Sequence, residues 1–122
     1  MYFQMLNKLI VGVFLTLLSF SAPATIFVSG SMLSNTIWSD TSQAYHVTSL
    51  LSVAPGVNLT INPGVQVLVD RGVKIKVAGS LSSLGTNSNP VKFSYSGGDV
   101  MGGWSGIEFS NSSGSIIRNS II

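Results

Sequence analysis

The sequence predicts an all-β fold in which short strands follow one another along a chain that turns at regular intervals. Three observations support this prediction. From Val47 onward apolar and polar residues alternate with a period of two, and turn residues interrupt the alternation every few positions. No stretch after the first 24 residues has the 3.6-residue period of a helix.

The alternation divides the chain into short segments, each with one apolar face. Such segments are typical of strands that bury one side and expose the other. They lie at residues 57–61, 65–69, 73–77, 91–95, 107–109 and 116–122.

Proline and glycine mark the corners between these segments. Pro55-Gly56 and Pro63-Gly64 are eight residues apart, and each pair suits the two central positions of a type II turn. Antiparallel hairpins prefer Asn-Gly or Asp-Gly turns, whereas Pro-Gly corners redirect the chain without requiring the flanking strands to pair. This favours a parallel β-solenoid of stacked coils, and an antiparallel β-sandwich is the alternative.

The N-terminal residues have the layout of a secretory signal peptide. Lys8 precedes the apolar run 9–20, and Ser21-Ala22-Pro23-Ala24 offers a cleavage site after Ala24. The run of about 12 residues is shorter than the roughly 20 that a membrane-spanning helix needs. We therefore expect a signal peptide over 1–24, a short linker over 25–35, and no stable membrane span after cleavage.

The composition excludes several functions. Hydrophobic residues make up 45% of the chain and charged residues only 8%, so Ser, Thr, Asn and Gly must form most of the polar surface. The net charge of +2 gives no electrostatic basis for binding nucleic acid. Without cysteine there are neither disulfides nor thiolate metal ligands.

Several motifs follow one another in an order that resembles a known family. They are a Pro-Gly corner before Leu59-Thr60-Ile61, a second Pro-Gly corner, Gly79-Ser80-Leu81, Asn89-Pro90-Val91 and Trp104-Ser105-Gly106-Ile107. In this order they resemble the start of the right-handed parallel β-helix domains of the pectin-lyase-like type, found in bacterial secreted and cell-surface proteins. The resemblance covers residues 36–122.

The resemblance implies an N-terminal cap and first coils over residues 36–122, with Ile37 and Trp38 in the capping segment. At twenty-odd residues per coil, the 98 residues after the leader make three to four coils, so we expect a truncated part of a longer protein. The expected function is a structural, adhesive or carbohydrate-binding role at the bacterial cell surface or outside the cell. The alternative is a polysaccharide lyase or glycoside hydrolase whose catalytic residues lie beyond residue 122.

No catalytic constellation is recognisable in the sequence. His46 has no second histidine or cysteine with which to bind zinc, and we expect neither a metal nor a cofactor. The four acids, Asp40, Asp70, Asp99 and Glu108, are scattered, and no spacing demands the carboxylate pair of a glycosidase. In Asp70-Arg71-Gly72 the aspartate is expected to bond to the backbone of a turn.

A few residues are weak candidates for contact with a ligand. Trp104 between glycines could pack against a sugar ring, although a role in holding a loop to the coil beneath explains it as well. Lys74, Lys76 and Lys92 are expected to point outward, where they either form a basic stripe or discourage sheet aggregation. Asn119 is a candidate for an internal amide ladder between coils.

Overall fold

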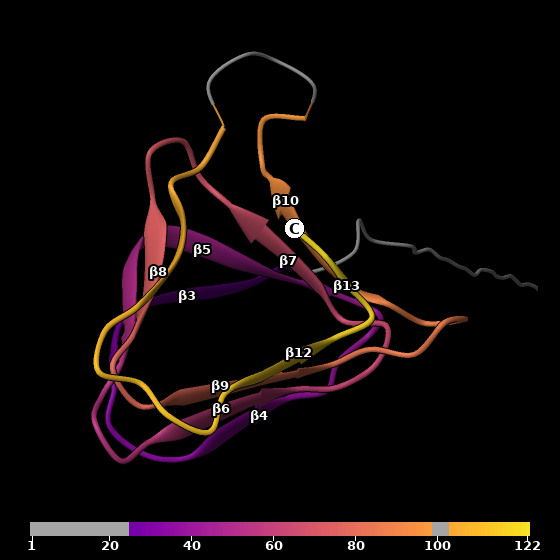
Figure 1. Ribbon diagram of the computed structural model, residues 1–122. Coiled ribbons are helices and arrows are strands. Elements are labelled where there is room, and N and C mark those ends of the chain that lie inside the picture. Colours follow the sequence, from indigo (N-terminus) through magenta and orange to yellow (C-terminus); the bar gives the residue numbers. More distant parts are fainter. Residues whose placement is uncertain (1–24, 99–102) are drawn as a thin grey trace, which may run out of the picture.

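The structure is a computed structural model that describes residues 25–98 and 103–122. Over these residues the chain forms strands and turns and no helix, and the strands wind into a β-solenoid of about three turns. Viewed down its axis the solenoid is triangular (Figure 1). The predicted signal peptide and Asp99 lie outside the described residues. None of the described residues forms a helix long and apolar enough to cross a bilayer.

The triangle has three faces, and each face is a stack of strands. The first face contains the N-terminal halves of β3 (Thr25–Met32) and β5 (Ala44–Val53), followed by β7 (Gln66–Val69), β10 (Val91–Tyr95) and β13 (Ser120–Ile121). The second face contains the C-terminal halves of β3 and β5, then β8 (Lys74–Val77) and β11 (Gly106–Phe109). The third face contains β4 (Thr36–Trp38), β6 (Asn58–Ile61), β9 (Ser80–Leu84) and β12 (Ile116–Arg118).

Every strand pair in the described residues is parallel. This confirms the predicted all-β parallel β-helix and rules out the antiparallel sandwich. The corner residues explain why the strands are parallel and not antiparallel, because a chain that turns at each corner reaches the next face instead of folding back on the same one.

The core is a set of apolar columns along the solenoid axis. On the first face Tyr45, Val67 and Phe93 occupy the same register position in successive coils. On the second face Leu51 lies beside Ile75. These five side chains are all buried, which is the inward half of the alternation seen in the sequence.

The Pro-Gly corners form the predicted turns. Gly56 and Gly64 have φ angles of +78° and +82°, which the third position of a type II turn requires and which glycine adopts without a Cβ penalty. Asp70-Arg71-Gly72 forms a turn of the same kind, since the Val73 N–H donates to the Asp70 carbonyl at 3.0 Å and Gly72 has φ +70°.

The prediction of a linker over 25–35 is wrong for residues 25–32, which form β3. Ile26 and Val28 alternate with exposed residues and pack against the core, so this segment is the first strand of the solenoid. Ile37 and Trp38, expected in a capping segment, lie in β4: Trp38 points inward and stacks on Tyr45 with ring centroids 4.6 Å apart, while Ile37 points outward.

Asn119 does not form an amide ladder in the core. It occupies the corner between β12 and β13 with φ +45°, and its Nδ2 donates to the Gly85 carbonyl of the preceding coil at 3.3 Å. The period-two pattern misplaced it because the corner interrupts the alternation between the two strands.

Candidate functional site

The outer surface of the first face brings together polar residues from three successive coils. His46 Nε2 lies 2.6 Å from Asp70 Oδ1, and Ser96 Oγ donates to the same oxygen at 2.5 Å. Since an ionised carboxylate only accepts hydrogen bonds, the proton in the first contact is on the histidine. The result is a hydrogen-bonded ladder that runs across the coils.

Strand register places Asp70 and Ser96 side by side, and His46 lies beside Leu68, two residues before Asp70. The Asp70 N–H donates to the Val47 carbonyl and the Ser96 N–H donates to the Val69 carbonyl, so Asp70 and Ser96 follow their strands at equivalent positions. His46 precedes Val47 and points outward, from where its imidazole reaches the carboxylate one coil further on.

An aromatic ring extends the ladder at its N-terminal end. Phe27 pairs in register with His46, and their ring centroids are 5.4 Å apart with an interplanar angle of 33°. Phe27 is 68% exposed, although a phenyl ring on a globular protein is usually buried. We call Phe27, His46, Asp70 and Ser96 the outer cluster.

The cluster holds Asp70 in its charged form. The hydrogen bond from the Ser96 hydroxyl, and next the one from His46, lower the pKa of Asp70 below its usual value. The side chains of His46 and Asp70 remain 22% and 37% exposed. Both of these hydrogen bonds go to Oδ1, and none of the described residues donates to the second carboxylate oxygen, which can accept a hydrogen bond from a ligand.

This arrangement differs from the predicted role of Asp70. Its side chain bonds to two side chains of neighbouring coils instead of to the backbone of its own turn. The turn is already closed by the Val73 N–H and by the positive φ of Gly72, so it does not need the carboxylate.

Trp104, the predicted sugar platform, is half-buried against the core. Its ring stacks on Phe93 with a centroid distance of 6.2 Å and an angle of 17°. The neighbouring Ser105 bonds to the coil beneath, where Oγ donates to the Gly72 carbonyl at 3.0 Å. Much of the indole surface is therefore used in packing.

The three lysines point outward as expected but do not form a basic stripe. Lys74 and Lys76 lie in β8 on the second face, whereas Lys92 lies in β10 on the first face. Lys74 Nζ donates to Glu108 Oε1 at 2.8 Å. This hydrogen bond, with the charges of Lys74 and Lys76, lowers the pKa of Glu108, and the carboxylate offsets one of the two lysine charges.

Asp40 lies in a separate turn outside the outer cluster. Asp40 accepts hydrogen bonds from Ser42 and Gln43 in an exposed turn, which lower its pKa. Within residues 25–98 and 103–122, no three or more His, Asp or Glu side chains come together as a metal site.

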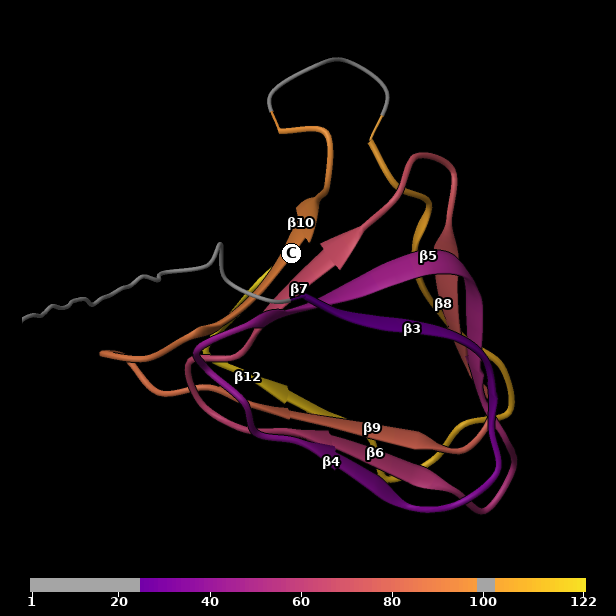
Figure 2. The same cartoon turned by 180° about the vertical axis from the view of Figure 1, so that it is seen from behind.

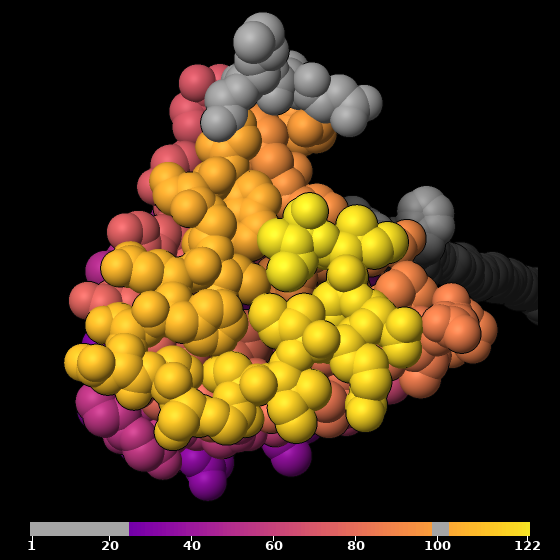
Figure 3. Space-filling view, in the orientation of Figure 1, coloured from indigo at the N-terminus to yellow at the C-terminus, as the bar shows by residue number. Residues whose placement is uncertain are grey.

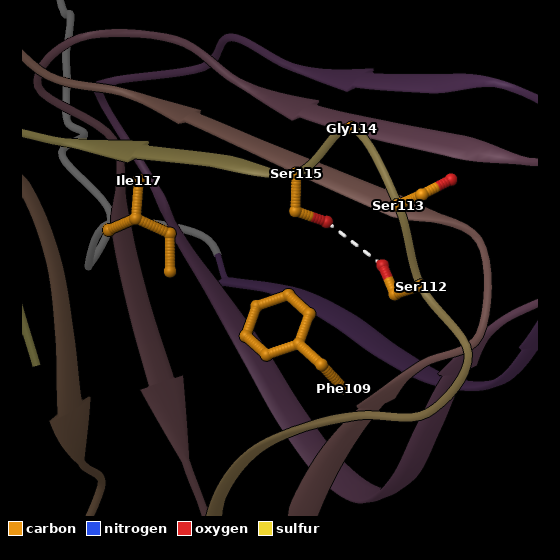
Figure 4. Close-up of a pocket in the computed structure, with 6 residues that line it drawn as sticks. All are labelled: Phe109, Ser112, Ser113, Gly114, Ser115 and Ile117. Carbon is orange, nitrogen blue, oxygen red and sulfur yellow. Dashed lines mark hydrogen bonds between the residues drawn. The ribbon is translucent and has the colours of Figure 1, made fainter.

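A shallow hollow of about 400 Å³ opens at the C-terminal end of the solenoid (Figure 4). Phe109 and Ile117 project into it from β11 and β12, and the Ser112 and Ser115 hydroxyls are 3.0 Å apart at its rim. The hollow lies on the last described coil, and none of the residues that line it is charged.

Sequence reasoning missed the outer cluster. It treated His46 and Asp70 separately, assigned Phe27 to a linker, and did not single out Ser96. The available signal was spacing, because His46 and Asp70 are 24 residues apart and Asp70 and Ser96 are 26 apart, each close to one coil.

Comparisons of the chain with protein-family models, with curated proteins and with solved structures found no match.

Proposed function

We propose that the chain is part of an exported β-helix protein of the pectin-lyase-like type, with a carbohydrate-binding role at the bacterial cell surface or outside the cell. The observation that carries this proposal is the outer cluster. It offers an exposed aromatic ring beside a carboxylate and a hydroxyl, on a rigid sheet.

The chemistry of the cluster suits a sugar. A pyranose presents an apolar C–H face and a rim of hydroxyl groups. The C–H face can pack on the Phe27 ring, while a hydroxyl donates to the second carboxylate oxygen of Asp70. The cluster is open to solvent, so a single sugar would bind weakly, and affinity would come from several contacts along a polymer.

The polar outer surface of the third face also supports an extracellular setting. Asn58 Nδ2 donates to Ser80 Oγ at 2.7 Å, and Thr60 Oγ1 donates to Asn58 Oδ1 at 2.7 Å. Hydroxyl and amide groups thus provide the polar surface that charged residues provide in most proteins. Such a surface can lie against a neutral polymer without burying unpaired charge.

Binding to a panel of purified neutral and acidic polysaccharides, measured by affinity electrophoresis, tests the proposal. Phe27→Ala and Asp70→Asn are each expected to weaken retardation by the polymer that binds the unaltered chain, by about tenfold or more. Leu50→Ala, an exposed position of β5 outside the cluster, serves as the matched control and should bind normally. The proposal fails if no polymer retards the chain, or if the two cluster variants bind as tightly as the control.

A further inference from the structure

A second hollow, of about 270 Å³, lies on the side of the solenoid where the second and third faces meet, and we call it the corner hollow. Residues from three successive corners line it, those between β5 and β6, between β8 and β9, and between β11 and β12. Figures 1 and 2 show these corners stacked on one another. The corner hollow is separate from the outer cluster, which lies on the first face.

The last of these corners is fixed to the preceding coil on both sides of Asn111. Ser110 N–H donates to the Val77 carbonyl at 2.9 Å, and Ser112 Oγ donates to the Gly79 carbonyl at 2.5 Å. Figure 3 shows this corner, in orange, against magenta residues of an earlier coil. Asn111 therefore has a defined place at the hollow, although its own side chain takes no part in the anchoring.

Two side chains that line the corner hollow have no hydrogen-bond partner among the described residues. They are the amide of Asn111 and the hydroxyl of Ser113, and both residues are exposed. Asn111 has φ +54°, a conformation that is uncommon for any residue other than glycine. Glycine would form this turn without strain, so the turn itself does not require the amide. The amide is available to a ligand.

The other two corners supply a hydroxyl and open space. Ser80 Oγ accepts a hydrogen bond from Asn58 Nδ2 at 2.7 Å, which leaves the hydroxyl proton of Ser80 to donate. Gly56 and Gly79 present only backbone to the hollow. A Cβ on Gly56 would meet no atom within 4 Å, so the space beside it is open.

The lining selects for a small neutral ligand. None of the residues that line the corner hollow is charged or aromatic. Its amide and hydroxyl groups both donate and accept hydrogen bonds, as the hydroxyls of a sugar do. A uronate would bring a carboxylate that no lining side chain can pair. The volume is slightly below the roughly 300–1,000 Å³ of pockets for drug-sized ligands, which leaves room for one sugar ring.

We infer that the corner hollow binds one neutral sugar unit through the Asn111 amide and the hydroxyls of Ser80 and Ser113. The inference rests on the proposed carbohydrate-binding function and adds to it a second site, on another side of the solenoid. A polymer that reaches both sites would be held more tightly than by either site alone.

Titration of the ¹⁵N-labelled full chain with glucose, galactose, mannose and N-acetylglucosamine, followed by NMR, tests this inference. At least one sugar should cause saturable shifts of the Gly56, Gly79 and Ser113 amides, with a Kd in the millimolar range because hydrogen bonds alone hold it. Asn111→Gly suits the positive φ and removes only the amide, so it should raise the Kd by about twofold to tenfold. Asn119→Gly, at the corner between β12 and β13 with φ +45°, is the matched control and should bind normally.

The outcomes separate this site from the outer cluster. Phe27→Ala should leave the shifts at the corner hollow unchanged. The inference is overturned if no sugar causes saturable shifts there, or if Asn111→Gly binds as tightly as the unaltered chain. Shifts confined to His46, Asp70 and Ser96 would also overturn it while leaving the proposed function intact. Shifts at the corner hollow, together with polymer binding that Phe27→Ala does not weaken, would support the corner hollow and overturn the outer cluster as the polymer site. Thermal melting checks that each variant is folded.

Discussion

Replacement of Gly79 by alanine should strongly destabilise the solenoid, because this glycine lies where two coils approach closely. A Cβ at this position would lie 2.1 Å from the Val57 carbonyl oxygen and 2.3 Å from the Ala54 carbonyl oxygen. Both oxygens belong to the backbone of the preceding corner and already accept hydrogen bonds, the first from Ser80 N–H at 2.9 Å and the second from Val57 N–H at 3.0 Å.

The magnitude follows from these contacts. Relief of the clash requires the corner to shift by about 1 Å, which has the cost of an overpacked core, about 1–3 kcal/mol. The same shift breaks or stretches two backbone hydrogen bonds, at about 0.5–1.5 kcal/mol each. Gly79→Ala should therefore lower the free energy of unfolding by about 2–6 kcal/mol, a large part of the roughly 5–15 kcal/mol that a typical domain has.

Gly56→Ala in the neighbouring corner is the matched control. Gly56 has φ +78°, but no atom lies within 4 Å of the position that a Cβ would take, so alanine there meets only backbone strain of about 1–2 kcal/mol. Urea denaturation followed by circular dichroism and by the fluorescence of the buried Trp38 measures both variants. If Gly79→Ala costs no more than Gly56→Ala, the argument from close coil packing is wrong.

Three further predictions concern the core, the outer cluster and the leader. Leu51→Ala, at a fully buried position, should lower the free energy of unfolding measured in urea by about 2–5 kcal/mol. Leu50→Ala, next to it in β5, should change that free energy by less than about 0.5 kcal/mol. Equal effects would contradict the assignment of Leu51 as inward and Leu50 as outward. Because folding lowers the pKa of Asp70 from 3.8, its ionised form stabilises the fold above that pH and this stabilisation is lost as pH falls through the lowered value. The urea concentration at the unfolding midpoint should therefore fall less between about pH 6 and about pH 3 in Asp70→Asn than in the unaltered chain. An equal fall in both proteins would refute the stabilising role of the hydrogen-bonded ladder. Finally, N-terminal sequencing of the full chain after export from a bacterial host should begin at Thr25; an exported product that retains residues 1–24 would contradict the predicted cleavage after Ala24.

The strands and corners could be predicted because they depend on local chemistry. Val57, Leu59 and Ile61 alternate with polar residues and are all buried, and Gly56 has the positive φ that its turn requires. Strand β3 escaped prediction because Gly30 and the irregular register between Val28 and Gly30 interrupt its alternation. Its apolar residues also directly follow the leader.

The outer cluster depends on register between coils of unequal length, which no local pattern specifies. Tyr45 pairs with Val67 and Val67 pairs with Phe93, so one coil has 22 residues and the next has 26. On the second face Ile75 pairs with Ile107, a step of 32 residues. A prediction with a constant coil length therefore aligns outward residues with the wrong partners on the neighbouring coils.

The exposure of residues in the last described coil could not be predicted from the sequence either. Phe109 and Val77 occupy equivalent inward positions, and nothing in their local sequence distinguishes a residue that will be covered from one that will not. In a globular core burial is decided within the domain, but in a solenoid each coil is buried by the next one. The alternation therefore predicts correctly which way Phe109 points, while its exposure is decided by whatever stacks on the last coil.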